Sequence, residues 1–297
     1  MDKYSGILGS ESAEFFEYCS RKIPKSIWLN SLMAKPEIIA SDLERKGWRL
    51  KRLFHENAFA LEGVQKPGSS KEFRDGMFNL QEKAAMVPAI VLGPEENDLV
   101  LDAAAAPGNK TLQLACLMSG KGRIVAIDKS AERVKSLRFN VKKFGMSNVI
   151  AQRSDLLLAK KEAIFDRILL DAPCSSEGIV RKDYDALADW SQELVERKAG
   201  LQKRMIEAAF RLLRKGGTLV YSTCSFAPEE NERVVAGLAS SGGAELEKIS
   251  VKGLVTRPGI EEYNGEEYGT EMRKCARIYP QDNDTQQFFV AKVRKMR

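Results

Sequence analysis

Two cysteines in this chain each follow directly on a short apolar run. Cys174 ends the segment Asp171-Ala172-Pro173-Cys174, and Cys224 lies in the segment Thr223-Cys224-Ser225. The runs before them are typical of buried strands, and the carboxyl ends of neighbouring parallel strands meet at one crevice. We therefore expect both thiols to face the same ligand.

Two thiols in one crevice suit methylation at carbon 5 of a pyrimidine. A thiolate can add to carbon 6 of the ring, which makes carbon 5 nucleophilic enough to accept a methyl group. A second thiol could then assist the release of the product. A carboxyl such as Asp171 can hydrogen-bond the polar edge of the base, and a cation such as Lys110 would favour the thiolate. A single isolated cysteine is more often a small buried hydrophobe, and we interpret Cys19, Cys116 and Cys275 in that way.

Short β-rich runs alternate with helical stretches through most of the chain. The predicted strands cover residues 98–103, 123–128, 149–153, 167–171 and 218–223, with one or two further strands between 251 and 294. Val134, Leu137, Val141 and Phe144 form one apolar stripe of an intervening helix. Repeated β-α-β units predict an α/β fold with a Rossmann-like, doubly wound parallel sheet.

The segment 99–111 is a predicted strand followed by a loop of small residues that opens a helix. The loop residues Ala104, Ala105, Ala106, Pro107 and Gly108 let the backbone approach a nucleotide-like ligand. Asp128 ends the second strand, where such folds receive ribose hydroxyls, and Asp155 follows the third strand, where it could accept from an adenine amino group. The pattern favours S-adenosylmethionine over a dinucleotide, and a P-loop would need glycines at Ala104 and Asn109.

Residues 1–75 are basic, with Trp28, Trp48 and Phe54 interleaved. We expect helices over residues 11–22 and 37–46, and strands over 26–32 and 55–61. Two interpretations of this segment have equal weight. It is a small α+β RNA-binding domain whose basic side chains contact phosphates, or its aromatic side chains form a core and its basic side chains only face solvent. Residues 76–297 then form the methyltransferase-like domain.

Composition limits the partners and the chemistry. The 297 residues carry a net charge of +6 with a pI near 8.9, which favours a polyanionic partner. Five cysteines without a C-x-x-C pair fit neither a disulfide framework nor a metal site, and His55 is the only histidine. No signal peptide or membrane span is evident, so we expect a cytoplasmic protein, and we expect a monomer.

On these residues the chain resembles the RNA 5-methylcytosine methyltransferases of the Sun/Fmu and nucleolar Nop type, and most of all their small archaeal transfer-RNA members. The resemblance covers almost the whole chain. It is carried by residues 81–86, by the loop 102–111, by Asp171-Ala172-Pro173-Cys174, and by Thr223-Cys224-Ser225 with Glu229-Glu230-Asn231. The chain departs from the family pattern at Trp28, Ala104, Asn109, Ser176 and Gln287.

The resemblance implies a role for each matching residue. Cys224 would be the attacking nucleophile and Cys174 the residue that assists product release. Asp171 and Lys110 would hold a flipped cytosine and border the methyl donor. Asp128, Arg133, Asp155 and the loop from Ala104 to Gly108 would hold S-adenosylmethionine.

The sequence thus predicts an S-adenosylmethionine-dependent RNA cytosine-5 methyltransferase, and the likeness to the archaeal members favours transfer RNA as its substrate. Ribosomal RNA as the substrate, or an inactive RNA-binding assembly factor on the same fold, are the alternatives. Phosphates would be contacted by the basic N-terminal segment, by Arg181 and Lys182, and by the tail 292–297.

Overall fold

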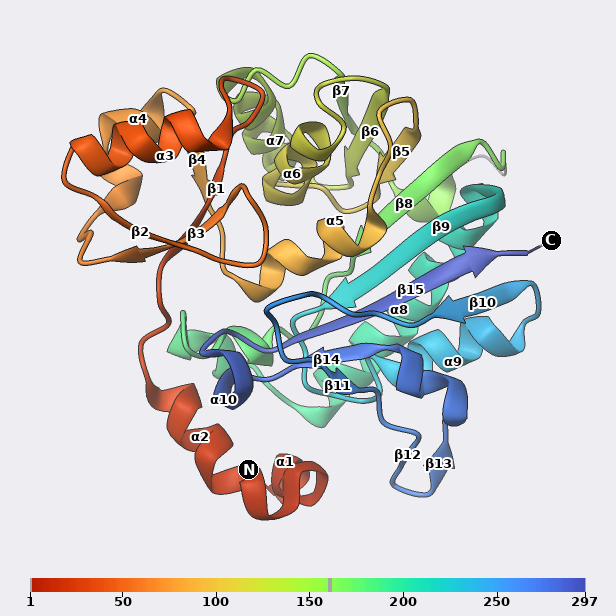
Figure 1. The fold of residues 1–297 in the computed structure, drawn as a ribbon. Coiled ribbons are helices and arrows are strands. Elements are labelled where there is room, and N and C mark those ends of the chain that lie inside the picture. The colour runs from red at the N-terminus through yellow and green to blue at the C-terminus, as the bar shows by residue number, and fades with distance from the viewer. Residues whose placement is uncertain (1, 160–161, 297) are drawn as a thin grey trace.

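The computed structural model describes residues 2–159 and 162–296, which form two main β-sheets with helices around them. Figure 1 shows the smaller sheet beside one end of the larger one. The chain builds the smaller sheet first and then enters the larger sheet.

The smaller sheet is antiparallel, in the order β2-β3-β1-β4. Its strands are β1 (Ser26–Leu29), β2 (Arg49–Arg52), β3 (Ala58–Glu62) and β4 (Phe78–Leu80), with the helices α3 (Pro36–Arg45) and α4 (Lys71–Arg74) between them. Ile27, Leu29, Leu43 and Phe78 are fully buried and give this sheet a core of its own. The predicted helix over 37–46 and the predicted strands over 26–32 and 55–61 correspond to α3, β1 and β3, whereas β2 and β4 were not predicted.

The larger sheet has the strand order β11-β14-β15-β9-β8-β5-β6-β7, and β10 pairs with β15. Five strands from β5 to β9 are parallel to one another: β5 (Leu99–Asp102), β6 (Arg123–Asp128), β7 (Val149–Arg153), β8 (Phe165–Asp171) and β9 (Leu213–Thr223). All five predicted strands are present, and the predicted Rossmann-like doubly wound sheet is confirmed.

The other strands of this sheet run antiparallel, so the sheet is mixed rather than wholly parallel. They are β10 (Ala244–Glu247), β11 (Arg257–Pro258), β14 (Ala276–Ile278) and β15 (Phe288–Lys295). The expectation of one or two late strands is wrong, because β10, β11 and β14 have only two to four residues each, too few for a periodic pattern to reveal. A separate hairpin joins β12 (Glu262–Tyr263) to β13 (Glu266–Glu267).

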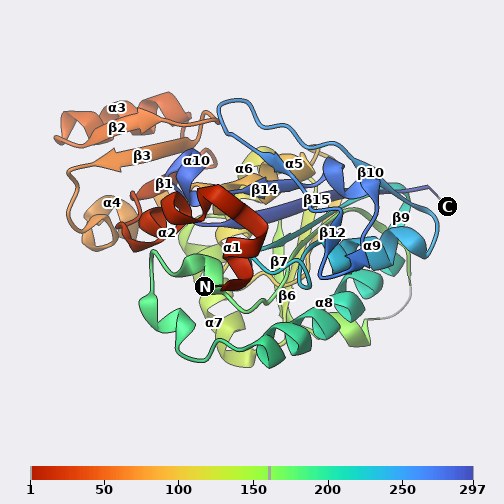
Figure 2. The same ribbon diagram turned by 90° about the horizontal axis from the view of Figure 1, so that it is seen from below.

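Helices cover both faces of the larger sheet (Figures 1 and 2). One face packs on α5 (Val87–Leu92) and α6 (Asn109–Leu117), and the other packs on α8 (Gln192–Leu212) and α9 (Glu232–Ser240). Alternate residues of a strand serve the two faces: in β9, Val220 packs toward α5 while Leu219 and Tyr221 pack toward α8. Helix α7 (Ala131–Lys143) carries the predicted stripe, in which Val134 and Leu137 are buried.

The first two helices lie away from the smaller sheet. Figure 1 shows α1 (Asp2–Leu8) and α2 (Ser12–Ser20) at the far side from β1–β4, near α10 (Pro280–Asn283). Phe15 of α2 packs edge-on against Phe226, with ring centroids 4.7 Å apart, and contacts Tyr279 in the same cluster. This packing ties the start of the chain to the segment that follows β9.

Candidate active site

The two predicted thiols meet at the carboxyl ends of β8 and β9. These strands are parallel neighbours with Asp171 opposite Ser222, so the loops that follow them start side by side. The Sγ atoms of Cys174 and Cys224 are 3.0 Å apart. Cys174 is buried, whereas Cys224 is partly exposed.

A glycine allows the two cysteine loops to approach so closely. The N–H of Gly178, in the 3-10 helix η5 (Glu177–Ile179), donates to the carbonyl of Cys224 at 2.9 Å. A Cβ atom at position 178 would lie 2.0 Å from that oxygen, which no side chain could tolerate. The backbone contact therefore needs a glycine at this position.

The environment raises the pKa of the Cys224 thiol well above its usual value. The largest cause is the hydrogen bond with Cys174, followed by burial and by the nearby charges of Cys174 and Asp171. Lys110 lowers the pKa, as we expected from the sequence, but its effect is smaller than these. The Cys224 thiol is therefore held in its protonated form more strongly than a free cysteine.

Asp171 and Lys110 are brought together as predicted. Lys110 Nζ donates to Asp171 Oδ2 at 2.7 Å, and Ser222 Oγ donates to the other carboxylate oxygen at 2.7 Å. The ammonium also lies 5.2 Å from the ring centroid of Phe288 on β15. These contacts fix the carboxylate of Asp171 at the mouth of the crevice, where it can accept or orient a polar base edge.

The small-residue loop follows β5 and is held by backbone hydrogen bonds. The N–H of Ala105 donates to the carbonyl of Ile127 at 2.9 Å, and Asn140 Nδ2 donates to the carbonyl of Pro107 at 2.9 Å. Gly108 has a φ of +109° just before α6, and a Cβ atom there would lie 2.9 Å from Leu137 Cδ1. The loop from Ala104 to Gly108 therefore leads directly into α6, and the first N–H groups of a helix have no partner within it.

Asp128 and Asp155 both lie at strand ends beside this loop. Asp128 is 4% exposed and accepts from the N–H of Ser130 at 2.9 Å. Arg133 Nη1 is 3.1 Å from its Oδ2, and Arg133 also donates to the carbonyl of Ala106. Among the described residues, no group makes an aligned hydrogen bond to Asp128 Oδ2. This buried acceptor fits a ligand with hydroxyl donors, such as the ribose of S-adenosylmethionine.

Asp155 is partly buried and has a structural role as well. It caps the 3-10 helix η4 (Leu156–Leu158), because its Oδ1 accepts from the N–H of Leu157 at 2.9 Å. The third acid at this edge, Asp102, is buried and accepts from Thr111 Oγ1 at 2.7 Å. Burial raises the pKa of Asp102 to about 7.

Arg181 is not a phosphate contact, which corrects the prediction from sequence. It is 7% exposed and donates to the carbonyls of Arg21, Lys22 and Thr285 and to the carboxylate of Asp284. Because its donors are occupied inside the fold, it joins three segments instead of binding RNA. Lys182 remains exposed.

Two lysines of the basic tail, Lys292 and Lys295, also have partners within the fold. Lys295 donates to the carbonyls of Phe210 and Leu213 at the end of α8, and Lys292 pairs with Glu247 at 2.8 Å. Arg297 lies outside the described residues. Residues 292–295 therefore lie inside the larger sheet, between β9 and β10, which the sequence pattern did not reveal.

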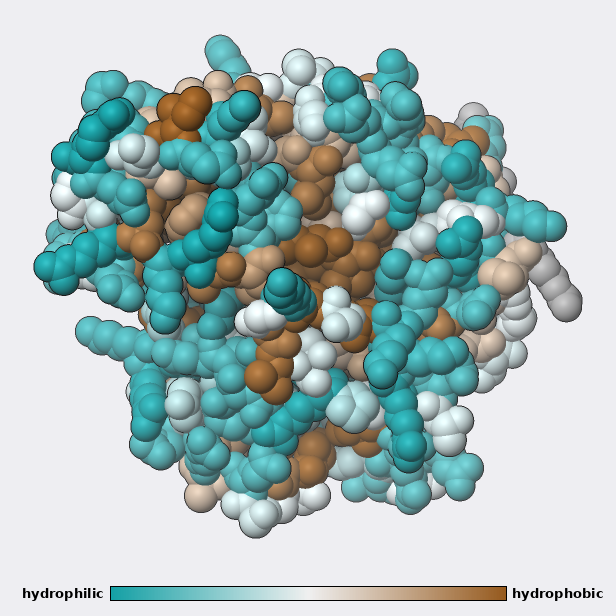
Figure 3. Space-filling model, viewed as in Figure 1, coloured by the Kyte–Doolittle hydropathy of each residue, from teal (hydrophilic) through white to brown (hydrophobic). Residues whose placement is uncertain are grey.

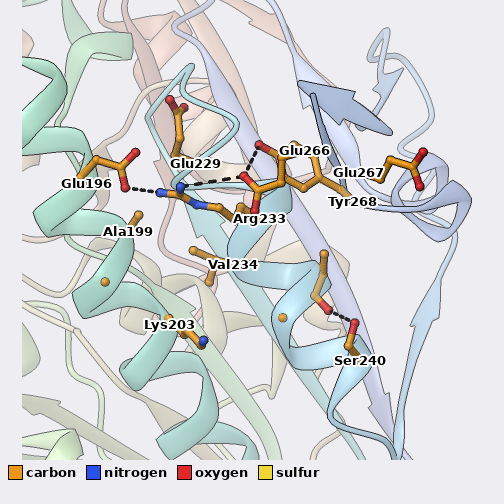
Figure 4. Close-up of a pocket in the computed structure, with 13 residues that line it drawn as sticks. Glu196, Ala199, Lys203, Glu229, Arg233, Val234, Ser240, Glu266, Glu267 and Tyr268 are labelled. Atoms are coloured by element: carbon orange, nitrogen blue, oxygen red, sulfur yellow. Dashed lines mark hydrogen bonds and ion pairs between the residues drawn. The ribbon is translucent and has the colours of Figure 1, made fainter. Parts of the chain in front are cut away.

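A pocket of about 420 Å³ lies elsewhere, between α8, α9 and the β12–β13 hairpin (Figure 4). Arg233 lies there between Glu196, at 2.5 Å, and Glu266, at 3.9 Å. None of the predicted site residues lines it. It is therefore separate from the thiol crevice.

Two further findings concern metals and membranes. Within residues 2–159 and 162–296, no group of three or more His, Cys, Asp or Glu side chains is arranged to hold a metal ion. No helix in the same ranges combines the length and the apolar composition needed to cross a bilayer.

Comparison with known proteins agrees with this geometry. Residues 89–294 match the family model described as 16S rRNA methyltransferase RsmB/F. The chain is 38% identical to a tRNA (cytosine(49)-C(5))-methyltransferase of Pyrococcus abyssi, over 100% of this chain and 96% of that protein. It is also 38% identical to the ribosomal RNA small subunit methyltransferase F of Vibrio vulnificus, of which it spans 63%. A crystal structure of a methyltransferase homolog from Pyrococcus horikoshii superposes with a TM-score of 0.88 at 33% identity, covering 99% of this chain and 94% of that one.

A doubly wound sheet with a small-residue donor loop and two facing thiols defines an S-adenosylmethionine-dependent RNA methyltransferase that acts at cytosine carbon 5. The chain belongs to the RsmB/F family of these enzymes. The family and the enzyme class predicted from the sequence are both confirmed.

Proposed function

We propose that Cys224 forms a transient covalent bond to carbon 6 of a cytosine in transfer RNA and that Cys174 assists its release. The observation that carries this proposal is the 3.0 Å separation of the two sulfurs beside Asp171. The target base would be drawn out of its stack into the crevice, as enzymes that modify bases commonly require. When bound, S-adenosylmethionine supplies an electrophilic methyl group.

The residues of the chain then perform the following steps. The proton of the Cys224 thiol passes through the Asp171 carboxylate to N3 of the ring while the sulfur bonds to carbon 6, which makes carbon 5 nucleophilic. Asp171, held by Lys110 and Ser222, orients the amino edge of the base and stabilises charge on the ring. After methylation, the proton on carbon 5 leaves and the bond between carbon 6 and sulfur breaks. Cys174 lies within reach to take part in that proton transfer.

For the methyl donor, we propose a site formed by the loop from Ala104 to Gly108 together with Asp128, Arg133 and Asp155. The spare acceptor of Asp128 supports ribose binding, and Asp155 would accept from the adenine amino group. Lys110, in the helix that follows this loop, donates to Asp171, at the end of the strand that precedes Cys174. Calorimetric titration of Asp128→Asn with S-adenosylmethionine tests this site, and unchanged affinity would argue against it.

Transfer RNA is the proposed substrate because the archaeal relative named for it matches over nearly its whole length. Ribosomal RNA is the alternative, favoured by the name of the family and of the Vibrio relative. Bisulfite sequencing of transfer and small-subunit ribosomal RNA after incubation with the enzyme and donor separates them. Cytosines that resist bisulfite conversion in ribosomal RNA alone would contradict the transfer-RNA proposal. The Cys224→Ala variant serves as the negative control.

For residues 1–75, we propose a role in RNA binding. The edge strand β2 supports this, because Arg49, Lys51 and Arg52 are all exposed on it. Figure 3 shows hydrophilic side chains over much of this part of the molecule. By contrast, Trp28 is fully buried and stacks on His55, so it belongs to the core.

Binding through β2 should depend steeply on salt. Replacing Arg49 and Lys51 by Gln should reduce the slope of log K against log salt by about 1 to 2. Gln at Arg45, an exposed residue of α3, serves as a matched control. An unchanged slope in the double variant would place the RNA elsewhere.

We further propose a monomeric enzyme that works in the cytoplasm. A reducing compartment would keep the two facing thiols from oxidising to a disulfide. Sedimentation with and without RNA tests the monomer.

A further inference from the structure

Two buried glutamates connect the two cysteine loops to each other. Glu177 belongs to the loop that carries Cys174, and Glu230 belongs to the loop that carries Cys224; they are 2% and 0% exposed. The role proposed for the cysteines does not use either carboxylate. A buried carboxylate is costly unless hydrogen bonds satisfy it, so its partners show what it holds.

Each glutamate binds the loop of the other cysteine. Glu177 Oε1 accepts from the backbone N–H groups of Phe226 and Ala227 at 3.0 and 3.1 Å, and from Ser225 Oγ at 3.1 Å. Its acceptors therefore fix the chain immediately after Cys224.

Glu230 makes the reciprocal contacts. Its Oε2 accepts from the N–H of Ser175 at 3.0 Å, and its Oε1 accepts from Ser175 Oγ at 2.5 Å. Gln202 Nε2 of α8 donates to Oε2 at 2.7 Å, and Ser225 Oγ lies 2.8 Å from Oε1, so that Glu177 and Glu230 share its one hydroxyl proton. Ser175 directly follows Cys174, so this carboxylate fixes the chain next to the first sulfur.

We infer that Glu177 and Glu230 are positioning residues whose exchanged hydrogen bonds hold the two thiols at their working separation. Neither carboxylate has to touch the substrate for this. A displacement of about 1 Å at a reacting group can cost on the order of 10²-fold in rate, so the effect would be seen in kcat. The inference rests on the proposed roles of the two cysteines.

The contacts predict which substitutions are tolerated. The described contacts of Glu177 all use one oxygen, so the carbonyl of a Gln could keep all three hydrogen bonds. At position 230, a Gln carbonyl could accept from Ser175 N–H and Gln202, while its amide group could donate to the two serine hydroxyls, which also act as acceptors. Ala at either position removes the acceptors and leaves buried N–H groups without partners.

The test compares Glu177→Ala, Glu230→Ala, Glu177→Gln and Glu230→Gln with the wild type. We expect kcat to fall about 10²-fold in the Ala variants, with KM for the methyl donor within about threefold, and both Gln variants to keep kcat within about threefold. Glu229→Gln is the matched control, because Glu229 binds Lys3 and Gln192 rather than the other cysteine loop. Thermal unfolding and donor binding confirm that each variant is folded.

A second measurement follows the geometry without RNA or turnover. Diamide removes two electrons and two protons from the thiols, is itself reduced to the hydrazine, and leaves a Cys174–Cys224 disulfide that peptide mass spectrometry detects. This reaction should slow in the Ala variants and keep the wild-type rate in the Gln variants.

Two outcomes would overturn the inference. Folded Ala variants with wild-type kcat and disulfide rates would show that the glutamates do not position the thiols. Folded Gln variants as slow as the Ala variants would show that the charge is needed instead, and this decides the matter even if an Ala variant does not fold. If the proposed function failed, Cys224→Ala would stay active while the disulfide rates still reported the effect of the glutamates.

Discussion

The sulfur atoms of Cys174 and Cys224 lie 3.0 Å apart although the residues are 50 positions apart in the chain. Adjacent parallel strands start their loops at the same edge, and the hydrogen bond from Gly178 to the carbonyl of Cys224 brings those loops into contact. The proximity has a chemical consequence, because the hydrogen bond with Cys174 raises the pKa of the Cys224 thiol.

The two cysteines should respond differently to substitution. Cys224→Ala should abolish methyl transfer, because no other described sulfur lies beside Cys174 to add to the base. Cys174→Ala should slow turnover about 10²- to 10⁴-fold and let a covalent RNA adduct accumulate on Cys224. Denaturing gels with labelled RNA detect the adduct. An adduct in Cys224→Ala instead would reverse the assignment.

Removing Cys174 should also lower the pKa of Cys224, because the hydrogen bond from Cys174 is the largest cause of its raised value. Alkylation requires the thiolate, so its rate rises with pH through the pKa. The pH of half-maximal alkylation of Cys224 by iodoacetamide should therefore be lower in Cys174→Ala than in the wild type. Peptide mass spectrometry measures the rate at this residue, and a shift to higher pH would contradict the expected coupling.

Gly178→Ala should separate the two cysteine loops. The added methyl would lie 2.0 Å from the carbonyl oxygen of Cys224, so the backbone must move. We expect kcat to fall about 10²-fold and the free energy of unfolding to fall by about 1–3 kcal/mol. Gly200→Ala is the control, since nothing lies within 4 Å of its added methyl and it is inside α8. Equal activity of the two variants would argue against the close approach.

Ser176→Gly should stabilise the protein. Ser176 has a φ of +65°, in the left-handed region that favours glycine. The substitution relieves this strain but adds freedom to the unfolded chain, so we expect a gain of up to about 1 kcal/mol. Urea denaturation measures it. A clear loss of stability would mean that the contact of Ser176 Oγ with the carbonyl of Cys174 at 3.4 Å outweighs the strain.

Asp102→Asn should make stability depend less on pH. Burial raises the pKa of Asp102 to about 7, against about 3.9 in an unfolded chain. The native state therefore binds this proton more tightly, and its contribution to stability is complete below about pH 4 and is lost as the pH rises to about 7. The free energy of unfolding should fall less between pH 4 and 7 in Asp102→Asn than in the wild type. Urea titrations measure this free energy. If it depended on pH equally in Asp102→Asn and in the wild type, the pH dependence would belong to other groups.

The sequence by itself determined the local elements and the chemical types at their ends. Short β-rich, apolar runs marked the strands from β5 to β9, and acids or cysteines at or after their ends indicated a ligand edge, because both signals are contained in a few consecutive residues. This was enough to predict the Rossmann-like sheet and the residues that surround the crevice.

Only the tertiary structure decided which charged side chains make contacts that stabilise the fold. Arg181 reads as a free cation in the sequence, but long-range contacts bury it against Lys22 and Thr285. No local pattern indicates that Glu177 and Glu230 are buried, yet each binds the loop that carries the other glutamate. Such pairings arise from the order of strands and the packing of distant segments, which depend on the burial of the whole core and not on any local pattern.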